Sequence, residues 1–225
     1  MPIITFLLIA FSTLIYLLQL GSQYLLGYDV LLFLGGKIND LIAQGEYWRL
    51  ITPIFLHGSL LHLGLNMYAL YVLGPAIERK YGRWLFLALY MMAGCYGFIA
   101  SYWFTSSASV GASTAIFGLI AAQAVFIYRN RRVYGARARP LLTNIAVILL
   151  INIILGLSPG IDNWGHFGGL ASGLVFAWFT VPRYQFADTV FGTSLIGEVS
   201  KRPWLVVSLM GCLAVLLVVF RTLVM

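Results

Sequence analysis

Long apolar runs constrain the fold of this sequence more than any other feature. Seven stretches are almost free of charged side chains. A helix needs about 20 mostly apolar residues to cross the hydrocarbon core of a bilayer, and every stretch reaches or approaches that length. The sequence therefore predicts an all-α polytopic membrane protein with spans at residues 3–26, 58–76, 84–104, 112–128, 141–157, 164–181 and 204–224.

The composition supports a membrane protein and argues against a nucleic-acid partner. Only 9% of the residues are charged, whereas soluble domains carry about 25%. The net charge of +7 comes mainly from three clusters between the apolar runs, at residues 79–83, 129–139 and 183–202. No basic face alternates with exposed aromatic residues, as a nucleic-acid surface would require. We therefore expect these charges to flank spans in a lipid bilayer, and we expect no nucleic-acid partner.

The same clusters predict how the chain is oriented. Cytoplasmic loops of membrane proteins carry an excess of Lys and Arg. With a cytoplasmic N-terminus, all three clusters face the cytoplasm and hold eleven basic residues, against Lys37, Arg49 and Arg221 outside. Seven spans then place the C-terminus outside. No basic segment precedes the first run and no clear cleavage site follows it, so we expect a retained span and not a signal peptide.

Two segments between the runs divide the chain. Residues 27–56 mix five charged residues with Trp, Tyr, Phe and Gly, which predicts a loop lying in the membrane interface. Residues 183–203 are polar and predict a cytoplasmic linker. We therefore expect a six-span core over residues 1–182 and an additional transmembrane helix over residues 204–225.

Polar residues at the ends of the spans are the functional candidates, because polar groups are costly to keep in a bilayer. The three histidines, His57, His62 and His166, all lie at predicted outer ends of spans. Ser113 begins the fourth span on the same side. Four separate positions of the chain thus meet at one depth in the membrane.

Ser113 has the surroundings of a nucleophile. It follows Gly111 and lies near a helix N-terminus, where free N–H groups favour a developing oxyanion. The alternative is an N-cap or a small packing residue. A stripe of small residues, Gly111, Ala115, Gly118 and Ala122, lies off the Ser113 face in an ideal helix. Either this stripe packs elsewhere or the helix begins after Gly111.

His166 is the candidate general base. Gly169, Gly173 and Ala177 follow it at helical spacing and make a smooth face that lets another helix approach closely. The imidazole could then reach a group on that neighbour, and a serine needs such a base to become a nucleophile. The alternative is a polar residue that merely lies in the interface.

His62 and Asn66 are four residues apart, so they share one face of the second span. Both side chains donate hydrogen bonds, although Asn66 alone could simply join two helices. A metal site is not expected, because His57 and His62 are five residues apart and no carboxylate lies among the histidines.

Together these residues resemble the motifs of the rhomboid family of intramembrane serine proteases. HGSLLHLGLN at residues 57–66 is similar to the family's HxxxxHxxxN, and GAS at 111–113 matches its GxS. GHFGG at 165–169, followed by Gly173, is similar to its final-span histidine motif. The resemblance covers roughly residues 5–182, and the ordered set of motifs is highly specific.

The resemblance implies a rhomboid-like six-helix bundle with a seventh helix added, and a reaction. Ser113 would be the nucleophile and His166 the base of a dyad without a third acid. The side chains of His62 and Asn66, with the Ser113 backbone N–H, would stabilise the oxyanion. Phe117 matches the position of an aromatic residue that stacks on the histidine. The substrates would be transmembrane proteins, approaching past the second and fifth spans, and no cofactor is implied.

The remaining family positions are expected to be structural. His57 matches a hydrogen-bonding residue, Trp48-Arg49 matches a pair in the first loop, and Glu78 belongs to a signature after the second span. Thr114 and Gly165 depart from the usual glycine and alanine, and neither change removes a required group. The size favours a bacterial inner membrane.

Two other functions remain open from the sequence. A non-proteolytic relative that binds or escorts membrane proteins usually lacks the serine or the histidine, and this chain has both. A transporter would carry charges in the middle of its spans, where this chain has almost none.

Overall fold

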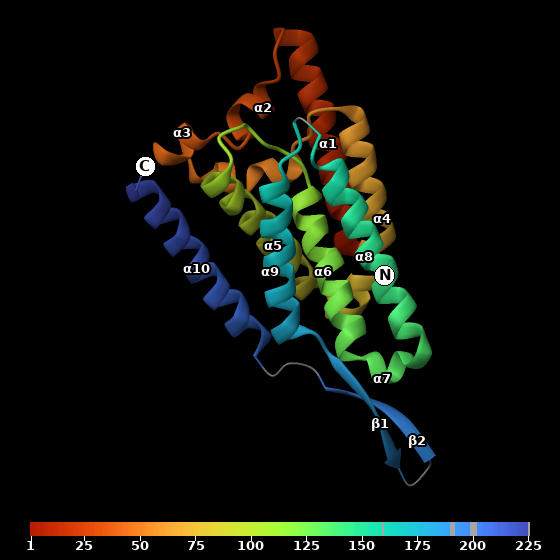
Figure 1. Ribbon diagram of the computed structural model, residues 1–225. Coiled ribbons are helices and arrows are strands. Elements are labelled where there is room, and N and C mark those ends of the chain that lie inside the picture. The colour runs from red at the N-terminus through yellow and green to blue at the C-terminus, as the bar shows by residue number, and fades with distance from the viewer. Residues whose placement is uncertain (159, 190–191, 199–201, 225) are drawn as a thin grey trace.

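The computed structural model describes residues 1–158, 160–189, 192–198 and 202–224. Its architecture is the predicted all-α, polytopic one, and each predicted apolar run forms a helix with ends shifted by a few residues (Figure 1). The long helices in the described residues are α1 (Ile3–Leu26), α4 (Leu60–Tyr81), α5 (Arg83–Phe104), α6 (Ser113–Arg129), α8 (Ala138–Leu155), α9 (Asn163–Thr180) and α10 (Pro203–Val224).

Among the described residues, five helical segments are long and apolar enough to cross a membrane, namely α1, α4, α5, α10 and the segment 131–155 that contains α8. Helices α6 and α9 are not among them. α6 has only 17 residues, and α9 contains Asn163, His166 and four glycines that dilute its apolar character. Twelve residues of α6 are buried, because it is packed among α4, α5, α8 and α9. A helix that is surrounded by protein can be shorter than a full membrane span.

The loop predicted to lie in the interface folds into short helices across the upper end of the bundle (Figure 1). Trp48 in this loop is 51% exposed, which suits an aromatic residue at a membrane surface. The elements of the loop are α2 (Val30–Gly35), α3 (Asn39–Ala43) and the 3₁₀ turns η1 (Tyr47–Leu50) and η2 (Thr52–Phe55).

Glycines bring α5, α6 and α9 into backbone contact. A methyl group added to Gly169 would overlap the carbonyl oxygen of Thr114, and one added to Gly173 would overlap that of Gly118. The small-residue stripe of α6 packs against α5, where Gly118 meets Ala93. α6 also begins after Gly111, so both explanations of the stripe hold.

The segment predicted to be a cytoplasmic linker, residues 183–203, contains a β-hairpin. β1 (Arg183–Thr189) pairs antiparallel with β2 (Gly192–Glu198), and the hairpin extends from the lower end of α9 past α7 (Arg131–Tyr134) (Figure 1). The prediction of a linker did not include these two strands. A single two-stranded hairpin is marginally stable alone, and the polar composition of this segment resembles that of a loop.

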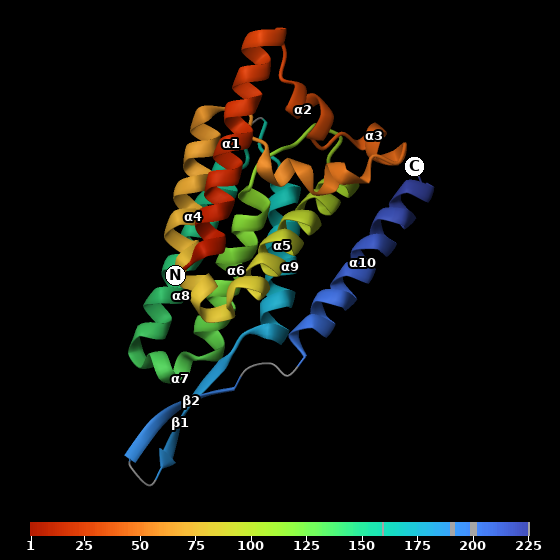
Figure 2. The same ribbon diagram turned by 180° about the vertical axis from the view of Figure 1, so that it is seen from behind.

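Helix α10 lies along the outside of α5 and α9 (Figure 2). The Tyr96 hydroxyl donates to the carbonyl of Met210 at 2.7 Å, and the Tyr102 hydroxyl lies 3.2 Å from Thr222 Oγ1. These two bonds join α10 to α5, one in the middle part of α10 and one at its C-terminal end.

Candidate active site

Ser113 and His166 come from different helices and meet at the upper end of the bundle. Ser113 is the first residue of α6, and His166 lies in the first turn of α9. Because Gly169 lets α9 contact α6, His166 Nε2 lies 3.0 Å from Ser113 Oγ. Ser113 is half-buried and His166 is 9% exposed. At this distance an imidazole can take the proton of a hydroxyl group.

An aromatic ring fixes the plane of the imidazole. Phe117 lies one turn after Ser113, and its ring stacks on His166 with centroids 4.3 Å apart and planes 6° apart. His166 Nδ1 is buried and has no hydrogen-bond partner among the described residues. The described part of the chain therefore orients this imidazole by stacking and not by a carboxylate.

Two side chains of α4 lie beside the turn that precedes Ser113. Gly111 has φ +125°, a conformation that favours glycine. A methyl group added to Gly111 would lie 2.6 Å from His62 Nε2 and 3.7 Å from Asn66 Nδ2, so both nitrogens flank this turn. The backbone N–H of Ser113 has no acceptor within its own helix. The arrangement can thus present three donors beside the Ser113 hydroxyl.

His57, which is expected to be a structural hydrogen-bonding residue, bonds to α1 through its backbone. Its backbone exchanges two hydrogen bonds with the Gln19 side chain, at 3.1 and 3.2 Å. Its imidazole is buried, and neither ring nitrogen has a hydrogen-bond partner among the described residues. The ring instead meets His62 edge to face, with centroids 5.2 Å apart. Burial, and to a smaller extent the neighbouring His62, lower the pKa of His57 to about 4, although the Phe55 backbone partly opposes the shift.

Arg49 and Trp48 hold the interfacial loop together. Arg49 is 2% exposed and forms an ion pair with Glu46 at 2.6 Å. Its other nitrogens donate to the carbonyls of Gly36 and Phe33 at 2.8 and 3.0 Å. Trp48 Nε1 donates to a carbonyl of α2 at 3.1 Å. A structural role for both residues stays a prediction.

Glu78, near the end of α4, joins that helix to α1. Its buried carboxylate accepts hydrogen bonds from the backbone N–H groups of Ile4 and Thr5, at 3.0 and 2.8 Å, and from the Thr5 hydroxyl at 2.7 Å. A carboxylate at a helix N-terminus satisfies free N–H groups and interacts favourably with the helix dipole. Glu78 thus anchors the first turn of α1 to the end of α4.

A cleft of about 300 Å³ leads to Ser113 between α4, α6 and α8. Asn66 and Phe117 line it beside Ser113, whereas most of the remaining wall is apolar. The α8 side of the cleft is loosely packed, because Ala138 is the only buried residue of that helix. A peptide with an apolar side could approach Ser113 through this opening.

The comparison with known proteins identifies the family. The sequence profile of the rhomboid domain matches residues 44–183, more than half of the chain. The chain belongs to the rhomboid family. It is therefore an integral, multi-pass membrane protein of a family of intramembrane proteases.

Three relatives show how far the similarity of this rhomboid extends. Rhomboid protease GluP of Bacillus subtilis (strain 168) is 43% identical over 202 residues, which cover 89% of this chain and 37% of GluP. RHOMBOID-like protein 9, chloroplastic, of Arabidopsis thaliana is 37% identical over 70% of this chain and 36% of its own length. Rhomboid-type serine protease 2 of Emericella nidulans is 33% identical over 62% and 28%. This rhomboid thus matches between 28% and 37% of the length of these three relatives.

Two residues near the site were not singled out from the sequence. Lys37 is fully buried, and its Nζ donates to the carbonyls of Thr105 and Ser107 at 2.7 and 3.1 Å. Burial lowers the pKa of Lys37 to about 8, and Asp162 partly offsets this. Asp162 caps α9 by accepting from the Gly165 N–H at 2.9 Å. The sequence signals that could have pointed to these two residues are the single lysine in the interfacial loop and an aspartate directly before a helix.

Proposed function

We propose that this rhomboid is a serine endopeptidase that hydrolyses peptide bonds in or near the transmembrane segments of other membrane proteins. The 3.0 Å separation of Ser113 Oγ and His166 Nε2 carries the proposal. Two nitrogens of α4 and the N-terminus of α6 lie beside the same hydroxyl, which adds support. The names of GluP and of the fungal serine protease point to the same activity.

The proposed reaction has two halves. Ser113 Oγ attacks the carbonyl carbon of the scissile bond while His166 accepts the hydroxyl proton, and the carbonyl oxygen becomes an oxyanion. His62, Asn66 and the Ser113 N–H donate to this oxygen. The oxyanion then collapses, the C–N bond breaks and His166 gives its proton to the leaving amine. Water, deprotonated by His166, attacks the acyl-enzyme in the same way and releases Ser113.

The substrate must present an unwound segment to the site. A peptide bond inside a helix is shielded by the backbone hydrogen bonds of that helix, so residues that weaken a helix ease its opening. The cleft between α4 and α8 offers a lateral path from the bilayer, because α8 is loosely packed. We infer that substrates approach there, from a bacterial inner membrane in which the N-terminus of this rhomboid is cytoplasmic and its C-terminus lies outside.

Cleavage of a labelled transmembrane substrate in liposomes tests the proposal. Wild type is compared with Ser113→Ala, His166→Ala and the control Ser106→Ala, which changes an exposed loop serine. We expect both dyad variants to lose cleavage by a factor of about 10³ or more, while the control and the thermal midpoints stay unchanged.

Two outcomes would count against the proposal. Cleavage that survives Ser113→Ala would exclude this serine as the nucleophile. Binding of several membrane proteins without cleavage by the wild type would instead favour a rhomboid that escorts its partners.

A further inference from the structure

A pocket of about 370 Å³ at the lower end of the bundle is lined by positive charge. Arg129 of α6, Arg131 and Arg132 of α7 and Arg183 of β1 surround it. None of the described lining residues is acidic, and the described part of the chain gives none of these arginines an ion pair. The three arginines of α6 and α7 supply most of this charge.

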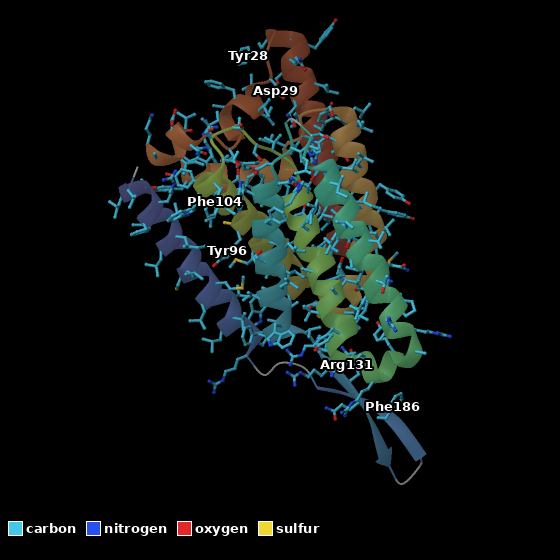
Figure 3. The ribbon with its side chains drawn as sticks, in the orientation of Figure 1. Tyr28, Asp29, Tyr96, Phe104, Arg131 and Phe186 are labelled. Atoms are coloured by element: carbon cyan, nitrogen blue, oxygen red, sulfur yellow. The ribbon has the colours of Figure 1, made fainter. Side chains whose placement is uncertain are left out.

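The pocket lies far from the candidate active site. Ser113 is the first residue of α6 and Arg129 its last, so the dyad and the pocket lie at opposite ends of this helix. Figure 3 shows Arg131 at the lower end, beside the base of the hairpin. The proposed peptidase reaction therefore makes no use of these arginines.

Aromatic rings hold two of the guanidinium groups in place. Arg129 lies 4.7 Å from the centre of the Trp178 ring and donates to the Trp178 carbonyl. Arg131 lies 4.8 Å from the centre of the Tyr128 ring. The two rings themselves stack, with centroids 6.3 Å apart. Guanidinium groups held in this way lose less freedom when they bind an oxyanion.

The same two rings begin an apolar groove of about 500 Å³ between α6, α8 and α9. Its other walls include Val125, Leu142 and Val175, and every residue beyond the Tyr128 and Trp178 rings is apolar. Trp and Tyr favour the depth at which headgroups meet hydrocarbon. A ligand that filled both spaces would carry an anion at one end and an apolar chain at the other.

We propose that the arginine pocket and the adjoining groove form a binding site for one anionic phospholipid. The phosphate lies against Arg129, Arg131 and Arg132, whose planar groups match phosphate oxygens. One acyl chain follows the groove past Trp178. A zwitterionic lipid is bound less well, because its cationic group adds repulsion from the arginines.

The lipid would also support the fold. Ala138 is the only buried residue of α8, although α8 forms one wall of the groove through Leu142. An acyl chain between α8, α6 and α9 therefore adds apolar contacts to the most weakly packed part of the core. The proposal needs only a chain embedded in a bilayer, so it stands or falls independently of the peptidase activity.

The test is lipid binding to the purified full chain in detergent. Phosphatidylglycerol or phosphatidylcholine is titrated in mixed micelles, and bound lipid is counted by native mass spectrometry beside the thermal midpoint. We expect one phosphatidylglycerol to bind at saturation and to raise the midpoint, and phosphatidylcholine to bind about tenfold more weakly. The double change Arg131→Gln/Arg132→Gln should weaken phosphatidylglycerol binding about 30-fold.

A matched double variant separates a site from diffuse attraction. Arg137→Gln/Arg139→Gln removes the same charge from the same connection, but neither residue lines the pocket. We expect its affinity for phosphatidylglycerol to stay within about twofold of wild type. Equal weakening by both double variants would mean general attraction to basic loops and would overturn the proposal.

Two further arms distinguish a lipid from phosphate alone. Ala124→Phe fills the groove and keeps every arginine, and it should weaken phosphatidylglycerol binding about tenfold or more. Inorganic phosphate at the same concentration should leave the thermal midpoint unchanged. An unaffected Ala124→Phe variant, or an equal stabilisation by phosphate, would reduce the site to an anion pocket.

Discussion

At the scale of single residues, the surroundings of Ser113 depend on three helices at once. α6 supplies the hydroxyl, α9 supplies His166 at 3.0 Å, and α4 supplies His62 and Asn66 beside the preceding turn. Within α6, the stack of Phe117 on His166 sets the plane of the imidazole, and Ser113 contacts its Nε2. Proton transfer depends steeply on this geometry, so residues that only orient the imidazole should affect the rate.

Replacement of Phe117 by Leu should slow cleavage without much effect on substrate binding. Leu keeps an apolar side chain but removes the stack, and such ring pairs are worth about 0.5–1.5 kcal/mol. We expect kcat to fall about tenfold with KM nearly unchanged, and Phe117→Tyr to keep most of the activity. Steady-state kinetics on a transmembrane substrate measure both constants. Equal activity of the Leu and Tyr variants would show that the ring orients nothing.

The buried His57 should make the protein less stable in mild acid. Its pKa is about 4 in the folded chain and about 6.5 when unfolded. Between these values the unfolded chain binds the extra proton, so stability falls as pH falls from 6.5 to 4 and levels off below. His57→Gln should remove about 3 kcal/mol of this loss at most.

Thermal midpoints in detergent between pH 7.5 and 4 measure this effect. Other titrating groups are shared by wild type and variant, so the difference between the two curves belongs to His57. Parallel curves would show that His57 keeps an ordinary pKa.

The sequence predicted the identity of the residues around Ser113 better than their contacts. The spacing of His62 and Asn66 placed them on one face, and the small residues after His166 predicted its close approach to a neighbour. The edge-to-face contact of His57 and the buried role of Lys37 could not be predicted. The Lys37 contacts join segments 68 and 70 residues apart that meet only in the folded chain. The contact of His57 with His62 depends on the conformation of the short turn between them.

At the scale of elements, the contact between α6 and α9 sets the position of the site. Gly169 lies against the backbone of Thr114, the residue after Ser113. Four residues later, Gly173 lies against Gly118 in the same way. The two helices therefore touch along a line that runs down from the candidate dyad, and a side chain on this line would separate them.

A single methyl group on this line should strongly reduce the rate of cleavage. Gly169→Ala would overlap the Thr114 carbonyl, so α9 must move away from α6. A misplacement of about 1 Å costs roughly 100-fold in rate, and overpacking destabilises by about 1–3 kcal/mol. The control is Gly64→Ala, because a methyl group there meets no atom within 4 Å. Cleavage rates and thermal midpoints of both variants are compared with wild type, and equal activities would mean that the contact tolerates expansion.

Helices on long apolar runs could be predicted from the sequence, whereas elements that depend on contacts with other parts of the chain could not. The seven long helices of the described residues fall on the predicted apolar runs, although Asn163, His166 and four glycines dilute the apolar character of α9. The hairpin at residues 183–198 was missed, because its strands are short and polar. The start of α6 depends on the positive φ of Gly111. In the sequence, the stripe of small residues left the start of this helix ambiguous.

At the scale of the whole molecule, the two ends of the bundle differ in chemistry. The candidate dyad, the interfacial loop and the C-terminal end of α10 lie toward the upper end, whereas α7 and the hairpin lie at the lower end (Figures 1 and 2). The lower end also carries the arginine pocket. Because basic loops stay in the cytoplasm, this asymmetry predicts that Ser113 opens toward the outside of the cell.

Labelling of single cysteines tests this orientation. Cys95 and Cys212 are first replaced by Ala, and then Ser106→Cys or Ala136→Cys is introduced in an exposed loop at the upper or the lower end. A maleimide that cannot cross membranes should label the Ser106→Cys chain in intact cells. The Ala136→Cys chain should react only after the membrane is opened. The reverse pattern would place the arginine pocket outside, and the positive charge of the loops would then need another explanation than retention in the cytoplasm.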